Sequence, residues 1–188
     1  QRALLFAGET GAALHIVHVS SGRGVAMAFE ARTRGIDVSI ETCPHYLLLT
    51  DEDVERLGTL AKCMPPLRAP AERDRLWTEL ELGHVDIVAS DHSPTEPALK
   101  QADFWSAWGG IAGVQTTLAA LLDGGHHERR LALTRIAALL AHNPARRFRI
   151  PRKGAIAPGF DADIVLVHLG AASTLRADQL MQRHKVSP

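Results

Sequence analysis

Residues 14–24, Leu14-His15-Ile16-Val17-His18-Val19 followed by Ser20-Ser21-Gly22-Arg23-Gly24, set the pattern of the fold. The first six residues form a short apolar run rich in β-branched side chains, which predicts a strand. The next five are typical of a tight turn. Apolar residues then recur at helical spacing from Val25 onward, and Gly35 stands where a helix would stop. The stretch therefore predicts a strand, a turn and a helix in that order.

The same order recurs along the chain. Further strands are predicted at 36–42, 59–64 and 85–89, and helices at 50–57, 71–82, 110–122 and 133–148. Strands that alternate with helices at this rhythm imply a parallel sheet with right-handed crossovers. We count four such units, which predicts an α/β fold.

The pattern changes at Pro151. Residues 154–167 predict a turn and a strand that no helix follows. We therefore place a domain boundary there, with one unit at 1–150 and a second at 151–188. The first residues read as the tail of a helix and the last stop without a terminating signal, so we expect the chain to be cut at both ends.

Composition excludes several classes of protein. The 188 residues are 46% hydrophobic, and 21 basic side chains balance 21 acidic ones, which indicates a globular protein that binds neither nucleic acid nor membrane. No apolar run approaches the roughly 18 to 20 residues of a membrane helix, and no complete signal peptide is present. We expect a cytoplasmic protein. Two cysteines are too few for a disulfide scaffold and are expected to be buried, reduced thiols.

Polar side chains follow three of the predicted strands. His18 and His45 are 27 residues apart, and His45 and Asp91 are 46 apart, as one and two strand–helix units would require. Because parallel strands present their carboxyl ends at one edge, these side chains are predicted to converge there. Two imidazoles and a carboxylate suit zinc or a similar divalent ion. His15 competes with His18, which we prefer because it lies nearer the strand end.

Other signals leave alternatives open. His92 could support the site or only form a turn. The segment Gly22-Arg23-Gly24 lacks the third glycine and the acid of a dinucleotide site. Cys43 and His45 could form a nucleophile–base pair, although Pro44 fixes their directions. Trp105 and Trp108, next to the glycines from Gly109, could form a substrate loop or an aromatic packing cluster.

Four segments carry a family resemblance. They are ETCPHY at 41–46, KCMPPLR at 62–68, SDHSP at 90–94 and WGGIAGVQ at 108–115. Together they resemble the allantoinase branch of the cyclic amidohydrolases, within the metal-dependent amidohydrolase superfamily. Dihydropyrimidinases, hydantoinases and dihydroorotases share part of the pattern.

The resemblance implies the C-terminal half of a TIM-type (β/α)8 barrel, followed by the start of a small β-sandwich. It also implies two divalent metal ions in a complete active site, with zinc expected and Co, Mn or Fe as alternatives. His18 and His45 would be ligands from the fifth and sixth barrel strands, and Asp91 from the eighth. The family's His-x-His pair and carboxylated lysine lie outside this sequence.

The implied reaction is ring opening of allantoin to allantoate by a metal-bound hydroxide, with Asp91 as the catalytic proton carrier. Met64 and Gly109 are expected to contact the small cyclic ureide. Alternatives are a dihydropyrimidinase or hydantoinase, a dihydroorotase, or a non-catalytic scaffold. The whole enzyme is expected to be a homo-oligomer, a tetramer. The 188 residues alone are expected to be inactive and to bind metal poorly, since a closed barrel takes about 250 residues.

Overall fold

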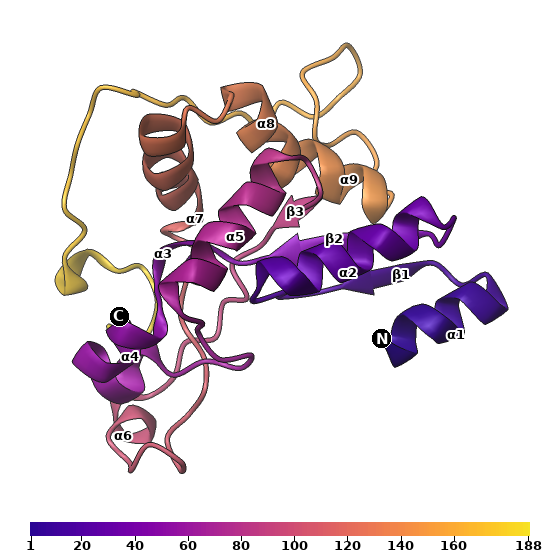
Figure 1. Cartoon of the computed structure of the whole chain (residues 1–188). Coiled ribbons are helices and arrows are strands. Elements are labelled where there is room, and N and C mark those ends of the chain that lie inside the picture. Colours follow the sequence, from indigo (N-terminus) through magenta and orange to yellow (C-terminus); the bar gives the residue numbers. More distant parts are fainter.

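A computed structural model describes residues 1–188, and a three-stranded parallel sheet lies at its centre (Figure 1). The strands are β1 (Leu14–Ile16), β2 (Val38–Thr42) and β3 (Ile87–Val88), in that spatial order. Leu14 pairs with Val38 in register, and Thr42 pairs with Val88. All three strands run in the same direction, so their carboxyl ends meet at one edge of the sheet.

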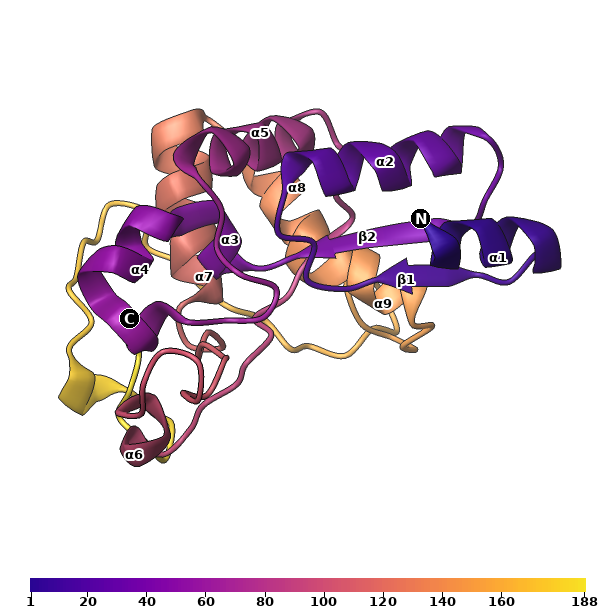
Figure 2. The ribbon, with the colours of Figure 1, turned by 60° about the horizontal axis from the view of Figure 1, so that its bottom comes forward.

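Two helices lie side by side along one face of this sheet (Figure 2). They are α2 (Gly22–Thr33) and α5 (Pro70–Glu81). Leu76, Trp77 and Leu80 of α5 are buried, as the helical spacing predicts. The Trp77 indole N–H also donates to the Leu47 carbonyl at 2.7 Å, which fixes α5 against the segment that follows β2.

The remaining helices surround the sheet edge and its second face. The short ones are α1 (Arg2–Thr10), α3 (Pro44–Leu48), α4 (Asp51–Leu57), η1 (Gly58–Ala61) and α6 (Pro97–Lys100). Two longer helical segments each change pitch along their length. The first is α7 (Thr117–Ala120) with η2 (Leu121–His127), and the second is α8 (Leu133–Ala137), η3 (Ala138–His142) and α9 (Asn143–Arg147).

The core joins the sheet to helices on both of its faces. Its fully buried side chains include Ile40 of β2, Leu76 and Leu80 of α5, and Leu121 and Leu139 of the later helices. Burying each side chain of this size stabilises the fold by about 1.5–3 kcal/mol. The sheet and its carboxyl edge are thus a rigid base for the loops above them.

The strand predicted at 59–64 is wrong. Residues 58–61 form the 3-10 turn η1, and β2 pairs directly with β3, so the chain has three strands and not four. The carbonyls that a strand would offer to a neighbour have other donors: Lys100 Nζ reaches the Thr59 carbonyl at 3.0 Å, and the Gly110 N–H reaches that of Lys62 at 3.0 Å. The strands that precede His45 and Asp91 are β2 and β3, and they are direct neighbours in the sheet. The resemblance implied the sixth and eighth barrel strands, which a seventh strand would separate, so this part of the expectation is not reproduced.

The helix predicted from residue 110 begins later, at Thr117. The glycines before it serve the loop instead. Ser93 donates its backbone N–H to the Ile111 carbonyl at 3.0 Å, and the Gly113 N–H donates to His92 Nδ1 at 3.1 Å. These contacts hold residues 110–113 against the segment that follows β3.

Residues 151–188 contain one 3-10 turn, η4 (Ala177–Gln179), and no strand. The strand predicted within 154–167 is wrong for this chain, because a strand needs a neighbour and its apolar side chains lie in solvent, Leu166 being 93% exposed. The segment runs along the outside of the molecule to end near α4 (Figures 1 and 2). No helix in the structure has the length and apolar character to cross a membrane.

Candidate metal centre and active site

Two site residues stand just beyond the carboxyl ends of the outer strands. His18 follows β1 by two residues, and Asp91 follows β3 by three. Both have left-handed backbone, with φ of 42° and 43°. Such a conformation costs a residue that has a Cβ about 1 kcal/mol or more, and it clusters at functional sites. The fold therefore accepts strain at two positions of one edge.

The third predicted residue, His45, belongs to the strand between them. Cys43 follows the last residue of β2 and precedes α3, Pro44 begins the helix, and His45 follows. The His45 side chain is only 5% exposed, and its Nε2 atom has no hydrogen-bond partner. A buried polar atom without a partner costs about 1–3 kcal/mol, so its presence indicates that a bound group completes it.

Cys43, His45 and Asp91 bring donor atoms that all lie within 4.8 Å of one another. His18 lies outside this group, although its charge contributes to the pKa of His45. The structure thus brings His45 and Asp91 together as predicted, with His18 farther out. Sequence reasoning missed Cys43 as a member, although a thiol two residues from a histidine at a strand end was the available signal.

Burial controls the protonation of this group. The pKa of His45 is lowered to about 4, mainly by burial; the Asp91 charge opposes the shift and the His18 charge adds to it. His45 is therefore a neutral imidazole at neutral pH, the form that binds metals. Burial, followed by the Asp91 charge, raises the pKa of the Cys43 thiol far above its usual range. An uncharged thiol of this kind is a poor nucleophile, which disfavours the nucleophile–base pair.

His15 has partners of its own. Its Nδ1 lies 2.7 Å from Ser39 Oγ, and its Nε2 lies 3.2 Å from a Glu41 carboxylate oxygen. Both contacts join β1 to β2 within the sheet. His15 is therefore a satisfied structural residue, which leaves His18 as the histidine nearest the strand end.

The two predicted substrate residues lie next to each other. A Cβ added at Gly109 would stand 3.1 Å from Met64 Cγ, and Met64 itself is 65% exposed. Two lysines hold their loops together. Lys62 Nζ donates to the carbonyls of Phe104, Trp105 and Ala107 at 2.7–2.9 Å.

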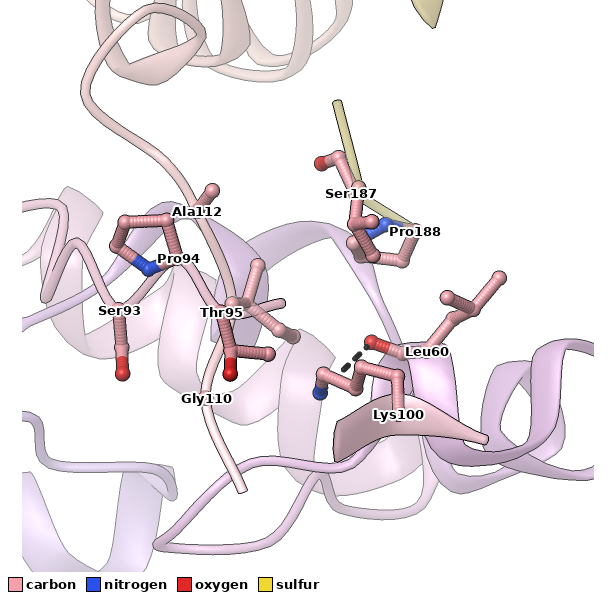
Figure 3. Close-up of a pocket in the computed structure, with 11 residues that line it drawn as sticks. Leu60, Ser93, Pro94, Thr95, Lys100, Gly110, Ala112, Ser187 and Pro188 are labelled. Carbon is pink, nitrogen blue, oxygen red and sulfur yellow. Dashed lines mark hydrogen bonds between the residues drawn. The ribbon is translucent and has the colours of Figure 1, made fainter. Parts of the chain in front are cut away.

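Lys100, the last residue of α6, makes the reciprocal contacts. Its buried Nζ donates to the carbonyls of Thr59 at 3.0 Å, Leu60 at 3.4 Å and Lys62 at 3.1 Å, and Figure 3 shows the bond to Leu60. Burial lowers the pKa of Lys100. The Met64 and Gly109 loops are thus fixed by ammonium–carbonyl bonds, which sequence analysis did not identify.

His92 supports the glycine segment. Its Nδ1 accepts from the backbone N–H groups of Gly113 at 3.1 Å and Val114 at 3.3 Å. Trp108 donates its indole N–H to Ser93 Oγ at 3.2 Å, whereas Trp105 is 87% exposed. The tryptophans therefore do not form a buried packing cluster.

The residues present fit a divalent metal ion. The group offers an imidazole nitrogen, a carboxylate oxygen and a sulfur, and His45 Nε2 is buried without a partner. Such donors suit zinc and related ions. His18, at the next strand end, could add a further nitrogen.

Known proteins resemble the chain along its whole length, although no family model matches it. The allantoinase of Deinococcus radiodurans is 58% identical over 189 residues, which span all of this chain and 42% of that protein. The allantoinase of Solibacter usitatus is 57% identical and is 41% covered. The chain therefore spans about two fifths of the length of these relatives.

Solved structures agree. The L-hydantoinase (dihydropyrimidinase) from Arthrobacter aurescens superposes on the whole chain with a TM-score of 0.94 at 36% identity, and 42% of that chain is covered. A D-hydantoinase from Thermus sp. gives 0.80 at 30% identity over 86% of this chain and 37% of its own. The α/β fold that the sequence predicted, part of a TIM-type barrel, is confirmed.

By both sequence and fold, the chain is similar over its whole length to cyclic amidohydrolases. Within that class the similarity is to allantoinases, as the motifs predicted.

Proposed function

We propose that this chain is part of a metal-dependent hydrolase that opens a cyclic amide, with allantoin as substrate and allantoate as product. The observation that carries the proposal is the placement of His45 and Asp91 donors together at the carboxyl edge of the sheet. The 58% identity to an allantoinase supports allantoin as the ring.

His18, His45 and Asp91 are the proposed metal ligands from this chain, with zinc the first candidate and Co, Mn or Fe as alternatives. Two ions are proposed for a complete active site. A divalent ion bound there would lower the pKa of water and polarise an amide carbonyl. His45 suits the role because its imidazole is neutral and lacks a hydrogen-bond partner at Nε2.

Asp91 is the proposed proton carrier. Its exposed carboxylate can take a proton from the water whose oxygen attacks the ring carbonyl carbon, and can return it to the ring nitrogen as the C–N bond breaks. Such general acid–base catalysis is worth about 10²–10⁴-fold in rate. The left-handed backbone at Asp91 supports this role because strained backbone of this kind clusters at functional sites.

Met64 and Gly109 are the proposed substrate contacts. Neither side chain carries a charge. The two lysines that hold their loops, Lys62 and Lys100, donate their hydrogen bonds to backbone carbonyls. A glycine allows the backbone to approach a ligand closely. Uncharged contacts of this kind suit a neutral ureide ring.

Residues 1–150 are proposed to form the barrel part and residues 151–188 a separate unit. The first range holds all three strands and nearly all of the buried core, whereas Leu180 alone is a buried hydrophobic residue in the second. This difference supports a boundary near Pro151.

Hydantoin is the second candidate substrate, because the chain superposes on a solved L-hydantoinase with a TM-score of 0.94. Both candidates share the metal chemistry and differ in the ring. The choice between them therefore depends on Met64, Gly109 and the loops that carry them.

A graft tests the proposal. This chain would replace the matching 42% of the Deinococcus radiodurans allantoinase, and the purified chimera would be assayed with allantoin, hydantoin, dihydrouracil and dihydroorotate. We expect kcat/KM to be highest for allantoin. A folded chimera that prefers dihydrouracil or dihydroorotate, the two six-membered rings, would refute the allantoinase assignment. A folded chimera that hydrolyses none of the four substrates would refute the proposal that the chain is part of a cyclic amidohydrolase.

A further inference from the structure

Three different metal-binding side chains meet between two adjacent strands. Cys43 and His45 follow β2, Asp91 follows β3, and the last residues of these strands, Thr42 and Val88, are paired in register. The rigid sheet therefore sets the spacing of the two segments, and the donor atoms lie within 4.8 Å of one another.

Burial makes this group different from a surface cluster. Cys43 is 0% exposed and His45 is 5% exposed, while Asp91 is open to solvent. The unpartnered Nε2 of His45 is a second, independent sign that the group binds something. Asp91 leaves one side open, through which an ion could enter.

We propose that Cys43, His45 and Asp91 bind one thiophilic divalent cation, of the Zn²⁺ or Cd²⁺ type, in an arrangement that does not need His18. A sulfur, a nitrogen and an oxygen are a donor set that zinc accepts, and a thiolate selects against Mg²⁺ and Ca²⁺. Tetrahedral coordination at ligand distances of about 2.0–2.3 Å places neighbouring donors roughly 3.3–3.8 Å apart. The donor atoms lie within 4.8 Å of one another, so side-chain shifts of about 1 Å would close the site.

The site goes beyond the proposed function, because it depends only on these three residues and not on hydrolysis of a ring. It shares His45 and Asp91 with the proposed catalytic ligands, so a thiophilic ion would compete for them. Binding replaces the sulfur–hydrogen bond of Cys43 with a sulfur–metal bond, and the released proton passes to the buffer.

Cd²⁺ alone, added to the purified 188-residue chain, tests the site. The sequence alone predicted that these 188 residues bind metal poorly, but the buried Cys43 sulfur adds a donor that this prediction did not include. We therefore expect one Cd²⁺ per chain, one proton released, and the ultraviolet charge-transfer absorption of a metal–thiolate bond. Cys43→Ser should abolish that absorption and weaken binding at least tenfold. Cys63→Ser is the matched control, because Cys63 is also buried but its sulfur faces the Pro65 carbonyl at 3.2 Å outside the group.

Two further variants keep the test decisive if Cys43→Ser does not fold. Asp91→Asn changes an exposed residue and should weaken Cd²⁺ binding while the thiolate absorption persists at saturation. His18→Ala should leave both unchanged. Absorption that is absent from the unmodified chain, that survives in Cys43→Ser, or that disappears in Cys63→Ser or His18→Ala would overturn the proposal. Because no substrate is involved, a chimera that fails to hydrolyse allantoin would leave this result unaffected.

Discussion

His18 and His45 flank one sheet edge in opposite environments. His18 is partly exposed and has a left-handed backbone, whereas His45 is buried in α3 with ordinary helical backbone and an unpartnered Nε2. Asp91 shares the left-handed backbone of His18 and is more exposed, and Cys43 resembles His45 in burial. The fold therefore gives up stability at this edge in two ways: backbone strain on the open side and an unsatisfied polar atom on the buried side.

The open side should carry the largest effect on turnover. Asp91→Asn in the chimera removes a proposed ligand and proton carrier, so we expect kcat/KM for allantoin to fall about 10²–10⁴-fold. The melting temperature should stay the same because the side chain is exposed. Asp123→Asn, on an exposed helical position, is the control. Activity within threefold of the unmodified chimera would show that the carboxylate has no role.

The buried side should control stability in acid. The pKa of His45 is about 4 when folded and about 6.5 when unfolded, so the unfolded chain binds more protons between these values. This loss of stability is absent above pH 6.5 and grows as the pH falls to 4, reaching about 3 kcal/mol. Urea unfolding of the metal-free chain should show it.

His45→Gln should remove that part of the pH dependence, whereas His127→Gln, at an exposed position, should not. Equal slopes of unfolding free energy against pH in the unmodified chain and His45→Gln would contradict the assignment of this histidine as buried and neutral.

Backbone strain at His18 predicts a smaller effect on stability, in which replacing the side chain with glycine relieves strain. Glycine adopts a φ near 42° freely and alanine does not, so His18→Gly should be at least as stable as His18→Ala, by up to about 1 kcal/mol. Both variants should lose metal-dependent turnover in the chimera. Thermal unfolding and activity assays would show the two trends, and a His18→Gly protein clearly less stable than His18→Ala would argue against strain.

The smallest effect belongs to Met64. Its side chain is exposed, so Met64→Ala should change stability by no more than about 0.5 kcal/mol. If it contacts the ring, KM for allantoin should rise a few-fold while kcat changes less. A change confined to kcat would place Met64 outside the substrate contacts.

The spacing of apolar and turn residues predicted the elements that depend on contacts between residues close in the sequence. The strands β1, β2 and β3 and the helix α5 follow from apolar period and turn residues, and Leu76, Trp77 and Leu80 are buried as expected. The segment 59–64 misled the same reasoning, because its carbonyls bind the Lys100 ammonium, which lies about 40 residues away. Nothing in the apolar pattern signals that distant donor.

Two other outcomes depend on partners that a sequence pattern does not show. Residues 164–167 have the apolar character of a strand, but pairing requires a neighbouring strand. At the site, strand ends predicted that His45 and Asp91 would meet, while the membership of Cys43 depends on the direction of its side chain beyond β2. The parallel strand–helix order was therefore readable from the sequence, whereas the number of strands and the direction of side chains were not.

Metal removal tests the central claim most directly. The chimera would be stripped with a chelator, assayed with allantoin, and assayed again after Zn²⁺ is restored, alongside its His18→Gly and Asp91→Asn variants. We predict that stripping abolishes turnover, that Zn²⁺ restores it in the unmodified chimera, and that neither variant recovers. Full turnover in protein shown by elemental analysis to be free of metal would contradict the account.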